Sequence, residues 1–140
     1  MSSRTPTPAH RFPVRVYYED TDAAGLVYHS NYLKFAERAR TEMLRSLGFG
    51  QRTLKETDGV MFAVRRCVID YRRPALLDDV LAVATQVTEI GGASVEVEQV
   101  IERDDETVAQ LNLTLACITP SGRPTRLPRA LRAAFASYSS

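Results

Sequence analysis

The sequence predicts an α+β protein in which a curved antiparallel sheet wraps around one long central helix. Three observations lead to this prediction: one long stretch with helical periodicity, several later stretches with the two-residue period of strands, and turn residues between those strands. A single long helix is then available to cover the apolar face of the sheet. At 140 residues the chain is expected to form one domain, 12–140, after a flexible polar lead at 1–11.

The first elements follow directly from the residue pattern. Residues 11–18 alternate weakly and are rich in β-forming residues, which predicts a first strand. In residues 31–47 apolar side chains recur at three- and four-residue spacing, which predicts the long helix. Ser30 or Asn31 can cap its first turn, and Gly48 follows its end.

After residue 59 the period of the chain changes to two. Strands are expected at 60–72, 80–90, 93–102 and 107–119. Successive hairpins would make these four strands antiparallel neighbours. One short helical turn is expected before them within 49–57, and a last helix after them at 128–137. Such a sheet leaves an edge strand uncovered, so we expect dimerisation by strand pairing.

The stretch most informative about function is 17–32, which reads YYEDTDAAGLVYHSNY. An acidic turn containing Asp22 leads through a small-residue bend to His29, at the start of the long helix. A carboxylate and an imidazole therefore lie on one loop that feeds a helix N-terminus. The helix dipole favours negative charge there, so this loop can support acid–base or nucleophilic chemistry.

Asp22 is the first candidate for catalysis. Its apolar neighbours would partly desolvate the carboxylate, which can then activate water or attack an acyl carbon itself. The simpler alternative is a turn aspartate that only holds loop amides. For His29, the backbone N–H can stabilise a developing oxyanion and the imidazole can orient water or bind a carbonyl; capping or packing is the alternative. Gly25 permits either a close approach to substrate or a positive φ.

These residues also carry a resemblance to a known family. The chain resembles the hotdog-fold thioesterases of the 4-hydroxybenzoyl-CoA type, and more closely their YbgC branch of acyl-CoA thioesterases associated with the Tol-Pal cell-envelope system. The matching positions are Arg15 and Val16, Thr21 and Asp22, Gly25, 27–29, Asn31 and Tyr32, 35–40, Ala75, 77–79 and 126–128. The resemblance implies the hotdog fold, Asp22 as the catalytic carboxylate, and active sites shared between subunits of a dimer or a homotetramer built as a dimer of dimers.

The resemblance also implies a substrate site for coenzyme A. Its phosphates call for basic side chains at the groove mouth, and we assign Arg66 and Arg123 to this task. Gly25, Val27 and Tyr28 are expected near the reacting group, although Tyr28, like Tyr32, can equally belong to the core. Solvated strand-edge charge is the alternative for the arginines. The further candidates for phosphate binding are Arg65, Arg72, Arg73 and Arg126.

One departure from the family pattern leaves the carrier of the acyl group open. Gly91 and Gly92 stand where relatives tend to place a basic residue. One phosphate contact is therefore in doubt, and an acyl-carrier-protein thioester stays open as the substrate.

Composition argues against several other classes of function. A net charge of +1 gives no electrostatic footprint for nucleic acid. The sequence has no apolar stretch of membrane-spanning length and no leader pattern, so we expect a cytoplasmic protein. Cys67 and Cys117 lie in apolar strand-like runs and are expected to be buried free thiols, which suits a reducing compartment.

A metal site is not expected, although one segment imitates a calcium loop. Residues 20–25 copy the opening of such a loop. Ala24 and Asn31 stand where that loop needs oxygen ligands, so we predict neither a metal nor another cofactor.

The function predicted from the sequence is therefore hydrolysis of an acyl-CoA thioester to free CoA and a carboxylic acid. Two alternatives stay open. A hotdog hydratase or dehydratase acting on enoyl or 3-hydroxyacyl thioesters would need the His29 imidazole itself. A non-catalytic acyl-thioester-binding module would bind its ligand without turnover. Acyl chain length, aromatic or aliphatic preference, and base or nucleophilic mechanism are not determined by the sequence.

Overall fold

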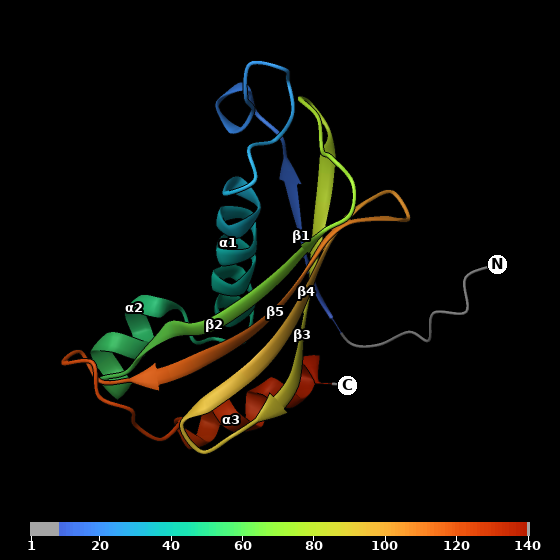
Figure 1. Ribbon diagram of the computed structural model, residues 1–140. Helices are drawn as coiled ribbons and strands as arrows, with labels where there is room; N and C mark the ends of the chain where they lie inside the picture. The colour runs from blue at the N-terminus through green and yellow to red at the C-terminus, as the bar shows by residue number, and fades with distance from the viewer. Residues whose placement is uncertain (1–8, 140) are drawn as a thin grey trace.

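The computed structural model describes residues 9–139 and consists of one curved sheet that wraps around a long helix (Figure 1). The strands are β1 (His10–Arg15), β2 (Met61–Tyr71), β3 (Val80–Ile90), β4 (Ser94–Arg103) and β5 (Glu106–Ile118). They lie in the order β1-β3-β4-β5-β2, and every neighbouring pair is antiparallel. The α+β class and the sheet-around-helix architecture are confirmed.

Helix α1 (Asn31–Ser46) packs one face on the concave side of the sheet. Its buried side chains recur at three- and four-residue spacing and form much of the core: Tyr32, Phe35, Ala36, Ala39, Met43 and Leu44. The helix ends at Gly48, whose φ of +88° is a conformation that glycine adopts at low cost.

The start of α1 differs from the capping expected. The side chain of Ser30, at the N-cap position, makes no capping hydrogen bond. Asn31 is not the N-cap either but the first residue inside the helix, and its Nδ2 donates to the backbone oxygen of Asp20 at 2.8 Å. The first helical residue therefore ties the helix to the acidic turn that precedes it.

Two short helical segments lie at the end of the molecule opposite the loop that precedes α1 (Figure 1). The first is α2 (Gln51–Thr53), which continues into a π-helical turn, η2 (Leu54–Asp58). The second is α3 (Arg129–Ala134), followed by a 3₁₀ turn, η3 (Phe135–Tyr138). This last helix is shorter than expected because its final turn tightens to 3₁₀ geometry, a common ending for helices. Leu131 and Phe135 are buried against the core.

The expectation that β2 and β3 are joined as a hairpin is wrong. β2 pairs with β5 at one edge of the sheet, and both β4 and β5 separate it from β3. The connecting residues 72–79 include Pro74 and make backbone hydrogen bonds with the loop before α1, so they do not form a tight turn. They cross the end of the sheet instead.

The N-terminal boundary also differs from the sequence prediction. β1 begins at His10, which pairs with Thr85, so residues 10 and 11 belong to the sheet and not to a flexible lead. Residues 1–8 of that lead lie outside the described residues. β1 ends at Arg15, earlier than expected, because the 3₁₀ turn η1 (Tyr18–Asp20) follows.

β2 is an edge strand whose outward side is uncovered. Its exposed apolar side chains are Met61, Val64, Val68 and Tyr71. Cys67 is also exposed, so the expectation of two buried thiols is wrong for this residue, because the sequence pattern does not separate an edge strand from a central one. Cys117, on the central strand β5, is buried and unpaired as expected. None of the described helices has the length and apolarity needed to cross a bilayer.

Candidate active site

The loop between β1 and α1 is a small closed structure and not an open connection. Thr21 and Val27 form an antiparallel bridge, and the Asp22 N–H donates to the Leu26 carbonyl at 2.8 Å. Gly25 has a φ of +80°, and a Cβ built on it would meet nothing within 4 Å. Of the two reasons expected for this glycine, the positive φ is therefore the one that the fold requires.

Asp22 combines the structural and the chemical roles that were weighed for it. Its Oδ1 accepts hydrogen bonds from the N–H groups of Ala24 at 2.9 Å and Leu26 at 3.2 Å. Its Oδ2 accepts none from residues 9–139. The side chain is exposed in the single chain, so the expected partial desolvation is not present there. One carboxylate oxygen is thus fixed by the loop and the other is available for reaction.

The backbone amide of His29 is also available. Its N–H finds no acceptor in the described part of the chain, and α1 begins two residues later. The Tyr28 carbonyl of the same peptide group accepts a hydrogen bond from the Asn31 N–H at 2.8 Å, which fixes the orientation of that peptide. Tyr71, at the end of β2, donates its hydroxyl to the His29 carbonyl at 3.2 Å. A fixed, unused N–H beside the positive end of a helix can bind an oxyanion.

The aromatic residues around His29 divide between surface and core. The Tyr28 ring is half exposed and lies 4.5 Å from the His29 ring, centroid to centroid. Tyr32 is buried, and its hydroxyl accepts the Ala75 N–H at 3.0 Å. Burial raises the pKa of Tyr32 above its ordinary value. Val27 is buried in the core and reaches the site only through its backbone.

The two arginines assigned to coenzyme A lie away from Asp22 in the single chain. Arg66 pairs in register with Thr114 on the face of the sheet opposite α1, in a shallow cavity with Glu96 and Asn112. Arg123 lies in the turn after β5, at the end of the sheet far from the loop before α1 (Figure 1).

The other arginine candidates for phosphate binding either form ion pairs with carboxylates or are exposed at separate places on the surface. Arg72 forms an ion pair with Asp70 at 3.3 Å, and Arg73 forms one with Glu106 at 3.1 Å. Arg65 and Arg126 are exposed. No cluster of these side chains faces Asp22 within one chain.

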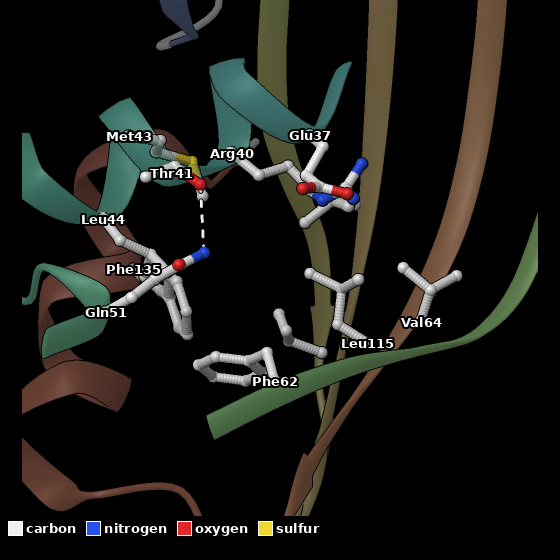
Figure 2. A pocket seen from close by; sticks show the side chains of 12 residues that line it. Glu37, Arg40, Thr41, Met43, Leu44, Gln51, Phe62, Val64, Leu115 and Phe135 are labelled. Carbon is white, nitrogen blue, oxygen red and sulfur yellow. Dashed lines mark hydrogen bonds between the residues drawn. The ribbon is translucent and has the colours of Figure 1, made fainter. Parts of the chain in front are cut away.

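A cavity that the sequence did not reveal lies between α1, the strands β2, β4 and β5, and the start of η3 (Figure 2). Its volume is about 270 Å³. Among its lining residues on α1, Glu37 is nearest to the start of the helix and lies about 9 Å along the helix axis from Asn31. Its sheet side is apolar, and its helix side is partly polar, with Glu37, Arg40 and Thr41. The apolar lining residues are Met43, Leu44, Phe62, Val64, Val95, Val97, Leu115 and Phe135. Periodicity identifies a buried face but not a void beneath it, so no sequence signal was available.

A buried polar network crosses the core beside this cavity. Arg40 donates through Nη1 to Oε1 of Gln99 at 2.9 Å. The fully buried Gln99 donates in turn to the Ala36 carbonyl at 2.9 Å and to the Thr85 hydroxyl at 3.0 Å. Burial lowers the pKa of Arg40, and the nearby charge of Glu37 opposes that shift. These donations fix the Gln99 amide, which therefore presents its oxygen to Arg40.

A second cavity of about 380 Å³ adjoins the first and shares Leu44, Gln51 and Phe62 with it. Gln51 donates to the Thr41 hydroxyl at 3.0 Å, as the dashed line in Figure 2 shows. The Phe62 ring packs against the Phe135 ring with 6.4 Å between centroids. Phe62 and Gln51 therefore stand between the two cavities.

Known proteins share both the sequence and the fold of this chain. Residues 16–135 match the thioesterase-like superfamily. Acyl-CoA thioesterase YbgC of Haemophilus influenzae is 47% identical over 125 residues, which cover 89% of this chain and 92% of that protein. Acyl-CoA thioester hydrolase YbgC of Escherichia coli is 41% identical over 131 residues, covering 92% and 97%.

A solved structure gives the same result for the fold. The probable thioesterase from Bartonella henselae superimposes with a TM-score of 0.83 at 38% identity, covering 86% of this chain and 99% of that one. The resemblance seen in the sequence is confirmed at both levels, and the chain belongs to the thioesterase-like superfamily with the hotdog fold.

Proposed function

We propose that this chain hydrolyses acyl-CoA thioesters to free CoA and a carboxylic acid, with Asp22 as the reacting carboxylate. The observation that carries the proposal is the Asp22 side chain, whose Oδ1 is held by two loop amides while Oδ2 stays available. The names and the extent of similarity of the YbgC relatives support the substrate class.

Two routes are compatible with one available carboxylate oxygen. As a base, Oδ2 takes a proton from a water molecule whose oxygen attacks the thioester carbon, and the C–S bond then breaks to release CoA as its thiolate. As a nucleophile, Oδ2 itself attacks that carbon, displaces the thiolate and leaves a mixed anhydride, which water hydrolyses. Both routes place negative charge on the carbonyl oxygen of the substrate.

The His29 N–H is the group that we assign to this developing charge. The peptide that carries it is already oriented by the Asn31 hydrogen bond to the Tyr28 carbonyl, so no reorganisation is needed during reaction. Gly25 and Tyr28 border the reacting group in this proposal. The Val27 side chain is part of the core and contributes only its backbone.

The uncovered edge of β2 supports a dimer in which two β2 strands pair antiparallel. A two-fold axis through the middle of β2 makes the two α1 helices antiparallel on one face of the joint sheet. The loop that carries Asp22 and His29, residues 21–29, is called the reactive loop. In such a dimer the reactive loop of each copy lies beside the cavity and the Arg123 turn of the other copy. We propose that the acyl group occupies this cavity and that Arg123 contacts a phosphate of CoA. Arg66 faces the opposite side and is left out of this site.

Several finer expectations stay predictions. The resemblance alone supports a tetramer built from two such dimers, a cytoplasmic location and an association with the Tol-Pal system. An acyl-carrier-protein thioester stays open as an alternative substrate.

The experiment that tests the proposal is thiol release from acyl-CoA thioesters of short to long chain length and of benzoyl type. Wild type and Asp22→Asn are compared at equal concentration. We expect turnover by the wild type and a loss of kcat of about a hundredfold or more in Asp22→Asn, with an unchanged circular dichroism spectrum. A folded Asp22→Asn variant with most of its activity contradicts the assignment.

A second variant separates the alternative functions. His29→Ala removes the imidazole and keeps the backbone N–H, so the hydrolase is expected to keep most of its turnover. A hydratase or dehydratase would lose its activity in this variant and would change the acyl group without releasing thiol. A binding module would bind acyl-CoA saturably, release no thiol, and bind equally well after Asp22→Asn.

A further inference from the structure

The reactive loop rests on a second segment, residues 74–79, which belongs to the crossing between β2 and β3. The Val27 N–H donates to the Ala75 carbonyl at 2.9 Å, and the Leu77 N–H donates to the Gly25 carbonyl at 3.2 Å. Leu26 and Leu76 form an antiparallel bridge between these two contacts. The position of the loop therefore depends on the position of this segment.

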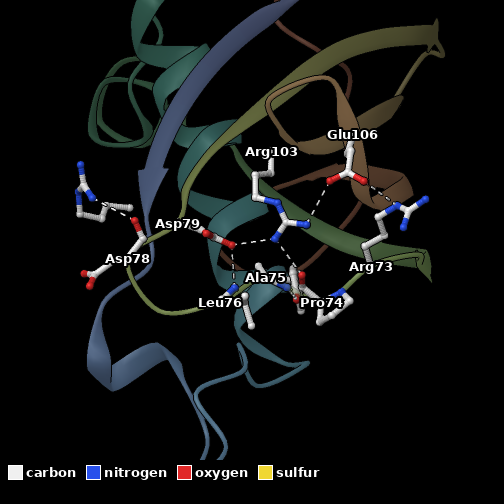
Figure 3. A network of polar contacts seen from close by, with 10 residues as sticks. Arg73, Pro74, Ala75, Leu76, Asp78, Asp79, Arg103 and Glu106 are labelled. Atoms are coloured by element: carbon white, nitrogen blue, oxygen red, sulfur yellow. Dashed lines mark hydrogen bonds and ion pairs between the residues drawn. The ribbon is translucent and has the colours of Figure 1, made fainter.

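Arg103, at the end of β4, holds the segment at both of its ends (Figure 3). Its Nη1 donates to Oδ2 of Asp79 at 2.8 Å and to the Pro74 carbonyl at 3.0 Å. The same Oδ2 of Asp79 accepts the Leu76 N–H at 2.8 Å. The guanidinium thus joins the first and last residues of the segment, and the Asp79 carboxylate holds Leu76 between them.

The turn that Arg103 and Asp79 close is strained. Asp78 has a φ of +70°, in the left-handed region that is unfavourable for a residue with a side chain. Arg15 donates to the Asp78 carbonyl at 3.1 Å and helps to hold this conformation. A strained turn keeps its shape only where neighbouring contacts fix it, and here those contacts come from β1 and β4.

The electrostatics of the pair agree with the geometry. Both side chains are about one-fifth exposed, so solvent screens them only partly. Burial raises the pKa of Asp79, but the Leu76 N–H and the Arg103 guanidinium lower it by more, and the pKa lies below its ordinary value. The hydrogen bond that Arg103 donates to Asp79 raises the pKa of Arg103. The pair is therefore charged at neutral pH.

We propose that Arg103 and Asp79 are positioning residues for the reaction, acting as a clamp that holds residues 74–79 and, through them, the Asp22 loop. The clamp touches neither Asp22 nor His29 and acts only through the backbone contacts of Gly25 and Val27 with the segment. The role in turnover rests on the proposed function; the role in holding the loop does not.

The test uses full-length variants that break the clamp and one that spares it. Asp79→Asn removes the charge while keeping the shape. Arg103→Leu removes the donations to Asp79 and to the Pro74 carbonyl, together with the one from Nη2 to Glu106 at 3.3 Å. Arg103→Lys keeps a charge toward Asp79 but loses the planar guanidinium, whose Nη1 is shared by Asp79 and the Pro74 carbonyl while its Nη2 donates to Glu106. Arg45→Leu is the matched control, because it also breaks an ion pair between an arginine and a glutamate, here with Glu42 within α1, and shares no partner with Arg103 or Asp79.

Turnover is the first measurement. We expect kcat to fall about tenfold to a hundredfold in Asp79→Asn and Arg103→Leu while KM changes by less than about threefold, because the reacting carboxylate is misplaced but the acyl cavity is intact. The double variant should lose no more than the worse single variant, since both act on one unit. Arg103→Lys should recover part of kcat, and Arg45→Leu should stay within about twofold of wild type.

Amide hydrogen exchange is the second measurement and needs no substrate. The Val27 and Leu77 amides should exchange at least about tenfold faster in Asp79→Asn and Arg103→Leu, while amides of β4 and β5 keep their wild-type rates. Unchanged exchange at Val27 together with unchanged kcat would overturn the proposal. Equal acceleration in β4 and β5 would also overturn it, because the pair would then serve overall stability.

The two measurements also separate this inference from the proposed function. If wild type releases no thiol from any acyl-CoA but the Val27 and Leu77 amides respond as expected, the clamp stands and the proposed hydrolysis fails. If wild type is active and neither kcat nor exchange responds, the hydrolysis stands and the clamp fails.

Discussion

Gly25 shows how one residue shapes the reactive loop. Its φ of +80° allows the Asp22 carbonyl to accept the Gly25 N–H at 3.0 Å, which closes the turn around the carboxylate. No neighbour lies where a Cβ would be, so a side chain at this position meets backbone strain and not a clash.

We therefore predict that Gly25→Ala lowers the free energy of unfolding by about 1 kcal/mol, because alanine adopts this conformation at a cost. Gly25→Asn should lose less, since asparagine tolerates the left-handed region. Urea unfolding measures both. Gly92→Ala is the control: it has equally open surroundings without a left-handed φ, so its change should stay within about 0.5 kcal/mol. Equal losses in Gly25→Ala and Gly92→Ala would contradict the strain argument.

At the scale of elements, the bulge in β2 decides what faces α1. The pairing of β2 with β5 shifts between Val64 and Arg66. Successive side chains of a strand normally alternate between the two faces of a sheet. The extra residue at the shift interrupts this alternation, so that the even-numbered Phe62 and Val64 and the odd-numbered Cys67 all lie on the helix side. The bulge thereby brings Phe62 to the floor of the cavity and to its boundary with the second cavity.

Phe62 is expected to limit the length of the acyl chain. Phe62→Ala removes the ring between the two cavities, so longer acyl chains should fit. We predict that the ratio of kcat/KM for long over short acyl-CoA rises by about tenfold or more. Met61→Ala is the matched control because Met61 lines only the second cavity, and its ratio should stay at the wild-type value. An unchanged ratio in a folded Phe62→Ala variant would place the acyl group elsewhere.

At the scale of the whole molecule, β2 leaves one edge of the sheet open. An antiparallel pair of β2 strands about their middle brings the two Cys67 residues to the same face, within reach of each other.

Mild oxidation should therefore cross-link two chains through Cys67, because its thiol is exposed and lies near the middle of the strand. Non-reducing electrophoresis should show the linked dimer for wild type and Cys117→Ser and not for Cys67→Ser. Light scattering should give a dimer for all three under reducing conditions. A monomer in that measurement contradicts the dimer, and a dimer that never cross-links points to a different interface.

The sequence predicted most of the elements, and the loop that joins the first strand to the long helix, because these depend on local patterns. Residues that lie close together in the sequence determine the helical and strand periods, the glycine after α1 and the acidic turn. Asp22 and His29 lie seven positions apart, so their shared loop could be recognised before any tertiary contact was known.

Features set by distant residues could not be predicted in this way. The pairing of β2 with β5, and hence the exposure of Cys67, depends on how residues 72–79 cross the sheet. Arg40 and Gln99 lie 59 positions apart, and Arg103 and Asp79 lie 24 apart, with no repeating pattern that joins them. Whether a side chain faces a cavity or a packed core is equally a property of the assembled structure.

The two amide hydrogen bonds to Asp22 also bear on when the catalytic geometry is established. A free carboxylate rotates about its side-chain bonds, and each reaction would have to select one rotamer at an entropic cost. Here that rotational freedom is lost once, as the chain folds, and not again in each turnover. In the proposed mechanism, the entropy of orienting the Asp22 carboxylate thus belongs to the folding equilibrium of the loop and not to the activation barrier of the reaction.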